Sequence, residues 1–213
     1  MLALLACTAK AKGPVINIRT DNVSMIIRVE QDGRLKTLHF GGVIEDASAF
    51  SDFKSGIHGN HGAPYDTYPT QGWRGFNEPA LAIIHKNGDL NTELRYLSHE
   101  TRTLADNNIT ETTIHLADKA EDVDVDLVYT AYKKQNVITA HSVIRNNEKG
   151  AVTLRNYYSS ALPIRADKYL LTHLYGSWAH EARVDNTVLT HGIKTIESKK
   201  GTRTTHTENP AFM

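Results

Sequence analysis

The chain has a single cysteine, Cys7, among its 213 residues. Intrachain disulfides are therefore excluded, and beyond Cys7 there is no thiol to act as a nucleophile or metal ligand. Basic and acidic residues number 24 each, so no excess of charge indicates a nucleic-acid partner. No stretch approaches the roughly 20 apolar residues that a helix needs to cross a bilayer. We expect neither a nucleic-acid partner nor a transmembrane segment.

The common motifs of catalysis and metal binding are also lacking. The sequence has no Gly-x-Ser-x-Gly elbow, and His99-Glu100 and His180-Glu181 lack the second histidine of a zincin helix. His58-Gly59-Asn60-His61 offers two imidazoles, but its spacing suggests no third ligand, so we interpret it as a polar loop. We expect no metal, no cofactor and no catalytic residue in this chain.

Three aspartates at alternate positions, Asp122, Asp124 and Asp126, are similar to the start of a calcium-binding loop. An EF-hand would then require glycine at Leu127 and glutamate at Lys133, and neither is present. On a β-strand, alternate residues point to the same face. We therefore predict a solvated strand face here.

The first eleven residues have the composition of a clipped export signal. Met1–Ala6 is apolar, and Ala9-Lys10-Ala11 has the small-x-small form of a signal-peptidase site. Leu4–Cys7 is similar to a bacterial lipobox, in which the cysteine is lipidated. We expect a mature chain from Lys12 that is periplasmic or lipid-anchored through Cys7. If these residues are not a leader, a cytoplasmic location follows.

Most of the chain alternates apolar and polar residues, which is the period of a half-buried β-strand. Val123–Tyr132 is the clearest run, and Gly33 marks a turn between two others. Strands over 80–85 and 94–97 flank Lys86-Asn87-Gly88, where the Asn-Gly pair favours a tight hairpin. Further strands are predicted over 25–29, 35–40, 137–145 and 152–158.

Many short strands with polar turns and no helical period predict an all-β fold of two packed sheets. The roughly 250 residues of strand–helix alternation that build a (β/α)8 barrel are not present in this sequence. One irregular stretch, Glu45–Trp73, is rich in glycine and proline and is long enough to indicate a functional or interfacial loop. Without repeats or low-complexity linkers, one domain is the simpler count.

The end of this loop carries Trp73 and Arg74 within the segment Tyr68–Leu81. Aromatic rings stack on the apolar faces of sugars, and a neighbouring arginine can bond their hydroxyls. Trp73 and Arg74 are therefore candidates for sugar binding. The alternative is a tryptophan packed over a sheet edge.

Several short motifs together resemble one known family. Each is weak alone, but their order and spacing fit the N-terminal domain of α-galactosidases of glycoside hydrolase family 36. The motifs are Asp32-Gly33-Arg34-Leu35, His39–Gly42, Tyr68–Leu81, Leu94–Tyr96, His99, Tyr129–Tyr132, Asn136–Thr139, Gly176–Glu181, Glu197–Gly201 and Asn209-Pro210.

The resemblance implies a large β-supersandwich of the galactose-mutarotase type over residues 12–207, with 208–213 starting the connection to a catalytic barrel. It implies an enzyme that removes terminal α-galactose from melibiose and raffinose with retention, using two barrel aspartates and no metal. Together with the leader, it predicts an exported bacterial protein. Many members are tetramers in which an N-terminal loop helps to close a neighbour's substrate pocket. Asp52 and the loop on to Trp73 match that region.

One departure concerns the predicted pocket. Family members often carry Gly-Asp-Phe-Arg where this chain has Arg74-Gly75-Phe76-Asn77, so Gly75 stands in place of the acidic residue. The resemblance predicts that this chain alone is inactive, with roles in barrel packing, oligomerisation and oligosaccharide binding through Trp73, Arg74 and Asp52. A free-standing carbohydrate-binding or structural β-sandwich is the alternative.

Overall fold

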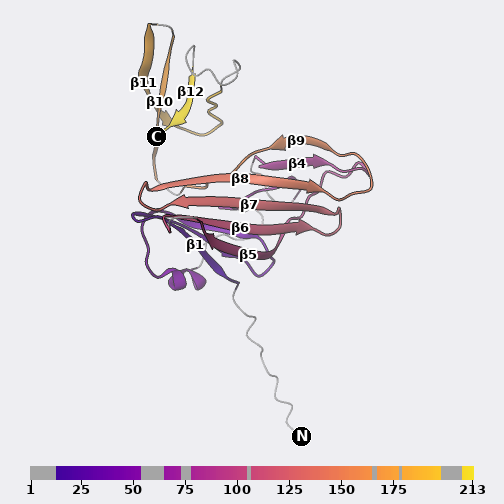
Figure 1. The fold of residues 1–213 in the computed structure, drawn as a ribbon. Helices are drawn as coiled ribbons and strands as arrows, with labels where there is room; N and C mark the ends of the chain where they lie inside the picture. Colours follow the sequence, from indigo (N-terminus) through magenta and orange to yellow (C-terminus); the bar gives the residue numbers. More distant parts are fainter. Residues whose placement is uncertain are drawn as a thin grey trace. The chain divides into compact units, whose positions relative to one another are not determined.

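The computed structural model describes residues 13–53, 65–72, 78–104, 107–164, 167–177, 179–197 and 208–213. These residues form β-strands and one short 3-10 helix, η1 (Ala47–Ser51), which confirms the predicted all-β class (Figure 1). The chain divides into two compact units, Met1–Ile164 and Arg165–Met213. Within the described ranges, no helix is long and apolar enough to cross a membrane.

One layer of the first unit is a four-stranded antiparallel sheet in the order β5-β6-β7-β8. The central strand β7 pairs along its whole length with β6 on one side and β8 on the other (Figure 1). The strands are β5 (Arg95–Thr103), β6 (Ile109–Asp118), β7 (Val123–Tyr132) and β8 (Val137–Asn146).

The other layer contains two smaller sheets, β1-β2-β3 and β4-β9, which are joined by an extended segment over 65–71. On one side of this segment, the amide of Thr67 donates to the carbonyl of Leu35 at 3.0 Å. On its other side, the amide of Gln71 donates to the carbonyl of Leu81 at 3.0 Å. The strands are β1 (Val15–Arg19), β2 (Val23–Val29), β3 (Leu35–Gly42), β4 (Leu81–Ile84) and β9 (Thr153–Tyr157).

A single apolar cluster lies between the two layers. Alternate residues of β7 contribute to it, as the period-two pattern predicts, and the strands of the opposite layer supply the rest. Tyr68, in the joining segment, is also buried there, and its hydroxyl donates to the carbonyl of Tyr158 at 3.1 Å. The principal members are Ile16, Ile18, Met25, Ile27, Val29, Leu81, Ile83, Ile114, Leu116, Val123, Val125, Leu127 and Tyr129.

The predicted solvated aspartate face is wrong for Asp126. That residue is buried on β7, where its carboxylate lies 2.7 Å from His115 Nδ1 and 2.7 Å from Arg145 Nη1. Burial by itself raises the pKa of Asp126, but the hydrogen bonds from His115 and Arg145 outweigh it and hold the pKa below its usual value. Asp124 is half-buried, and Asp122 lies in the preceding turn with a positive φ of 58°. Partners on neighbouring strands therefore allow a carboxylate to be buried.

The predicted hairpin over 80–97 is also wrong in its pairing. The Asn-Gly turn does form, since Gly88 has a φ of 86° and the amide of His85 donates to the carbonyl of Asp89 at 2.9 Å. Beyond the turn, however, the chain crosses to the opposite layer. Strand β4 pairs with β9, and β5 pairs with β6.

The second unit contains one antiparallel sheet in the order β11-β10-β12. Its strands are β10 (Tyr169–Ser177), β11 (His180–Leu189) and β12 (Glu208–Phe212). The sheet therefore continues past residue 207. The division of the chain into residues 1–11, 12–207 and 208–213 stays a prediction.

The fold buries most of the Asp66 carboxyl, which makes its charged form unfavourable. Asp66 lies in the joining segment, opposite Lys36 of β3, and its Oδ1 is buried without a hydrogen bond. Burial raises the pKa of Asp66 from 3.8 to about 6, although the charges of Arg34 and Lys36 act in the opposite direction. The carboxyl therefore keeps its proton to a higher pH in the folded chain than in the unfolded chain.

The first prediction tests the apolar cluster. Leu127→Ala should lower the free energy of unfolding by roughly 2–5 kcal/mol. The Leu127 side chain is only 2% exposed, so its truncation leaves a cavity in the core. Denaturant titration measures the change. Leu154→Ala on β9 is the control, since Leu154 is 42% exposed and its truncation should cost well under that amount. Equal losses in the two variants would contradict this placement of the core.

The second prediction concerns Asp66. Below about pH 4 the folded and unfolded chains both carry the proton, so the ionisation of Asp66 has no effect on stability. Between about pH 4 and pH 6 only the folded chain keeps it, so stability falls as the pH rises, and the full cost remains above pH 6. Asp66→Asn should therefore stabilise the chain by roughly 1–3 kcal/mol at pH 7 and by little at pH 3. Unfolding curves of both proteins at pH 7 and pH 3 measure the difference. An equal gain in the free energy of unfolding at the two pH values would contradict the prediction.

Candidate functional site

Asp52 is the sequence-predicted site residue that the structure describes. It is exposed and follows η1, where its amide donates back to the carbonyl of Phe50. At the other end of η1, the Asp46 carboxylate accepts from the amide of Ser48 at 2.8 Å. This capping contact also lowers the pKa of Asp46. The segment 46–53 is therefore a closed turn with hydrogen bonds at both ends.

Arg28 of β2 holds this segment on the sandwich. Its guanidinium is largely buried and donates to the carbonyl oxygens of Phe50, at 3.0 Å, and of Phe53. It also pairs with Glu30 at 2.6 Å, which balances its charge. The two carbonyls lie on either side of Asp52 in the sequence, so one buried arginine fixes the backbone around that carboxylate.

Aromatic rings adjoin the same segment. The ring of Phe50 lies 6.1 Å from that of His39 and 6.0 Å from that of Phe53, and both pairs are tilted. Phe53, the residue after Asp52, is 39% exposed. A carboxylate next to an exposed aromatic residue in the sequence offers the two elements that sugar sites combine, an acceptor for hydroxyls and a surface for stacking.

Trp73 and Arg74 lie outside the described residues, but both ends of the segment that carries them are fixed. The amide of Ala80 donates to the carbonyl of Pro69 at 2.7 Å. Gly72 has a φ of 90°, and a Cβ at this position would come within 2.4 Å of the Asn91 side chain. Only glycine fits that approach. The grouping of Trp73 and Arg74 with Asp52 stays a prediction.

Other residues singled out in the sequence also lie outside the described ranges. They are Cys7, His58, His61 and, within the motif Gly176–Glu181, Trp178.

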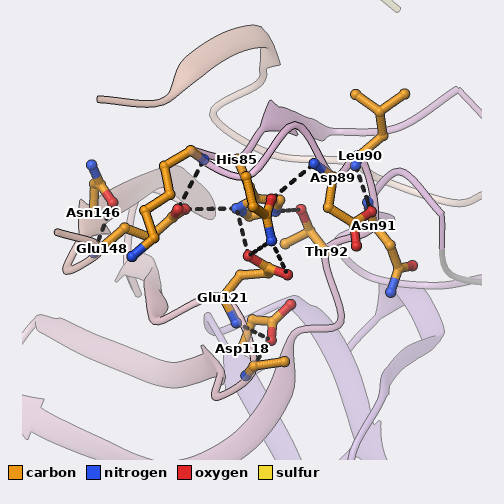
Figure 2. Close-up of polar contacts among 12 residues, drawn as sticks. His85, Asp89, Leu90, Asn91, Thr92, Asp118, Glu121, Asn146 and Glu148 are labelled. Carbon is orange, nitrogen blue, oxygen red and sulfur yellow. Dashed lines mark hydrogen bonds and ion pairs between the residues drawn. The ribbon is translucent and has the colours of Figure 1, made fainter. Parts of the chain in front are cut away.

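A polar cluster that the sequence analysis missed lies at one end of the first unit. His85 follows β4, Glu121 lies in the β6–β7 turn, and Glu148 lies between β8 and β9. His85 Nδ1 is 2.7 Å from Glu148 Oε1 and 4.0 Å from Glu121 Oε2 (Figure 2). The side chain of His85 is fully buried, that of Glu148 is 2% exposed and that of Glu121 is 14% exposed. Three connections from both layers thus meet at one imidazole.

Neighbouring groups orient all three side chains. His85 Nε2 lies 2.9 Å from the hydroxyl of Thr92, and the amide of Lys86 donates to Glu148 at 3.0 Å. The side-chain amide of Asn87 donates to both oxygens of Glu121, at 3.3 and 3.2 Å. Burial alone raises the pKa of Glu148, but the hydrogen bonds from His85 and the Lys86 amide outweigh it and lower the pKa.

These three side chains are the one group of histidine, cysteine and carboxylate donors in the described residues that is close enough to hold a metal ion together. No spacing rule could have found it, because the residues lie in three separate connections. The sequence carries one hint, a histidine that directly ends the buried run of β4.

The third prediction tests the anchoring of Asp52. Arg28→Met should lower the free energy of unfolding by roughly 2–4 kcal/mol, because it leaves Glu30 without its cation and removes the guanidinium donor from the carbonyls of Phe50 and Phe53. Amide hydrogen exchange over 46–53 should become faster. Arg19→Met is the control, since Arg19 pairs with Glu45 at an exposed site and should change stability by less than about 1 kcal/mol. Unchanged exchange over 46–53 in Arg28→Met would show that Arg28 does not anchor the segment.

Comparisons with known proteins agree with this architecture. A model of the glycosyl hydrolase family 36 N-terminal domain matches residues 33–213. Alpha-galactosidase AgaA of Geobacillus stearothermophilus is 26% identical over 219 residues, covering 91% of this chain and 30% of that protein. Alpha-galactosidase C of Emericella nidulans is 27% identical over 194 residues, covering 84% of this chain and 26% of that protein.

Solved structures show the same fold. A structure of AgaA in complex with raffinose superposes with a TM-score of 0.83 at 23% identity, covering 92% of this chain and 31% of that one. The α-galactosidase from Lactobacillus brevis gives a TM-score of 0.83 at 21% identity, covering 94% and 30%.

The chain spans about 30% of the length of the first curated relatives that it matches. The matched family model nevertheless covers most of this chain. The chain therefore belongs to glycosyl hydrolase family 36, and what it carries is the N-terminal domain of that family.

Proposed function

We propose that this chain serves as the N-terminal domain of an α-galactosidase that releases terminal α-galactose from oligosaccharides. The observation that carries the proposal is the family match over residues 33–213. The matched relatives include α-galactosidases, and structures of AgaA contain raffinose or stachyose. Sugars of this class are therefore the proposed substrates.

The chemistry of the proposed enzyme is assigned to a separate catalytic domain. Glycoside hydrolysis uses two carboxylates at a defined separation on either side of the scissile bond. Among the described residues, the buried carboxylates Asp126 and Glu148 are each engaged by a histidine on a sandwich framework. The proposed role of this chain is to pack against the catalytic domain and to complete the substrate pocket.

Exposed apolar side chains support the proposal that a partner covers part of the first unit. On β9 and the residues after it, five large apolar side chains are exposed by 42 to 66%. Exposed apolar side chains indicate an interaction site where they form one contiguous patch. The proposed occupant is the catalytic domain. The five residues are Leu154, Tyr157, Tyr158, Leu162 and Ile164.

Asp52, Trp73 and Arg74 are the proposed contribution to the substrate pocket. The anchored turn around Asp52 and the fixed ends of the Trp73 segment support the idea, because binding residues are held best on a rigid framework.

We also propose a homo-oligomer, a tetramer as the family resemblance implies, in which the segment that carries Trp73 reaches a neighbouring subunit. Export through residues 1–11, with Cys7 as a lipid anchor, is a further proposal that rests on the composition of the leader.

The fourth prediction concerns activity. The purified chain should hydrolyse no aryl α-galactoside above the buffer rate, because the two reacting carboxylates belong to the proposed catalytic domain. AgaA, assayed in parallel, is the positive control. Release of the aryl group by the chain alone, lost on boiling, would overturn the assignment of the chemistry to another domain.

The same preparation separates the alternative function. A free-standing carbohydrate-binding sandwich should bind raffinose directly in isothermal titration calorimetry and remain monomeric at high concentration. A domain that packs on a catalytic partner should show no heat of raffinose binding and should self-associate through its exposed apolar residues.

A further inference from the structure

We propose that His85, Glu121 and Glu148 form a binding site for a divalent transition-metal cation of the zinc class. The site would be structural and lies outside the residues proposed to bind sugar. The proposal does not depend on the function of the family.

The donor atoms already converge. One oxygen of each glutamate and Nδ1 of His85 all lie within 4.8 Å of one another, and His85 Nδ1 is 2.7 Å and 4.0 Å from the two carboxylates. Zinc binds imidazole nitrogen and carboxylate oxygen at about 2.0–2.2 Å. Small rotations of the two glutamates would bring all three atoms to that distance from a common point. Figure 2 shows both carboxylates directed at the same edge of the His85 ring.

Charge favours a cation at this point. Two carboxylates face one imidazole, so even a protonated ring would leave one negative charge unbalanced in a nearly buried place. Lys86 lies close to Glu148, but its side chain is exposed and its charge is screened by solvent. A divalent ion would balance both carboxylates and leave His85 neutral.

The surrounding hydrogen bonds are those that a ligand set needs. For Nδ1 to bind a cation, the ring proton must lie on Nε2, and Nε2 is 2.9 Å from the Thr92 hydroxyl that would accept it. The amide of Lys86 and the side chain of Asn87 fix one glutamate each. The Lys86 amide bonds the Glu148 oxygen that does not face Nδ1, whereas Asn87 donates to both oxygens of Glu121 and would share the facing one with the ion.

A hollow borders one of the three proposed ligands. It has a volume of about 590 Å³, and Glu121 forms part of its wall, whereas His85 and Glu148 do not line it. Its other carboxylates are already engaged: Asp118 accepts from the amides of Glu93 and Ala120, and Asp89 accepts from the amides of Leu90 and Asn91. Glu93 pairs with Arg95 at 3.1 Å. Of the acidic residues that line the hollow, Glu121 is the one that also faces His85.

The donor set selects the class of ion. Imidazole suits zinc, cobalt and nickel, whereas calcium and magnesium prefer six or more oxygen ligands. One nitrogen and two carboxylates therefore match the zinc class, with a fourth position left for a water molecule. The ion would join the connection after β4 to the β6–β7 turn and to the β8–β9 connection, and so would tie the two layers together at this end.

The fifth prediction tests this site by zinc titration. The chain should carry Cys7→Ser, His58→Gln and His61→Gln, so that the thiol and the His58–His61 pair cannot bind the ion. Isothermal titration calorimetry should give one zinc per chain, and the zinc-loaded chain should unfold at a higher temperature. Calcium and magnesium in excess should not displace the zinc. Cobalt in the same site should give the visible absorption of a tetrahedral ion.

Glu121→Gln is the decisive variant, because it keeps the size of a partly exposed side chain and removes a ligand charge. It should weaken zinc binding by roughly 10- to 100-fold and abolish the thermal shift. Glu111→Gln is the matched control, since Glu111 pairs with Arg102 elsewhere on the sheet and should leave binding unchanged. Circular dichroism checks that each variant is folded, and His85→Gln gives a second test of the same ligand set.

Two results would overturn the proposal. One is the absence of zinc binding at one per chain in the parent protein. The other is binding that Glu121→Gln leaves unchanged, which would assign the ion to different histidines of the chain.

Discussion

Burial of one face of β7 is the constraint on which the first unit depends. Its alternate residues from Val123 to Ala131 form the centre of the apolar cluster, and both neighbouring strands pair with it over their full length. Because alternate residues on a strand face opposite ways, a shift by one residue would bring Asp124 and Asp126 into the core. The register of the whole four-stranded sheet is therefore fixed by this strand. The opposite layer, although divided into two sheets, has only to cover that face.

The sequence predicted best the features that depend on local pattern. Period-two alternation located β2, β3, β7 and β8, and Gly33 and Gly88 adopt the positive φ that their turns require. Pairing was harder, because β4 and β9 are about 70 residues apart and no local signal links them. The Asn-Gly turn favoured a hairpin between β4 and β5, but the buried β4 pairs with β9, whereas the largely exposed β5 pairs with β6 in the opposite layer.

The buried polar groups show the same limit. Asp126 was expected in solvent, since a carboxylate on a strand carries no sign of its partners, and the structure places His115 and Arg145 around it. The His85 cluster joins residues 36 and 27 positions apart in the sequence, each in a different connection. A histidine at the end of an apolar run is a weak hint, because most such histidines are simply packed. Of the proposed sugar-binding residues, Asp52 was found by family resemblance, whereas its anchor Arg28 follows from the structure alone.

Arg28 and His85 together explain how an apolar sandwich can hold long polar connections in place. Apolar packing fixes strands well, but a connection exposes backbone groups that must be bonded wherever water is excluded. The buried guanidinium of Arg28 donates hydrogen bonds to two such carbonyls. Glu148 accepts hydrogen bonds from the ring of His85 and from the backbone amide of Lys86. In each case a polar side chain on or beside a core strand bonds to a connection. Each anchor depends on a charge partner, so a substitution that removes the partner should loosen the connection before it disturbs the core.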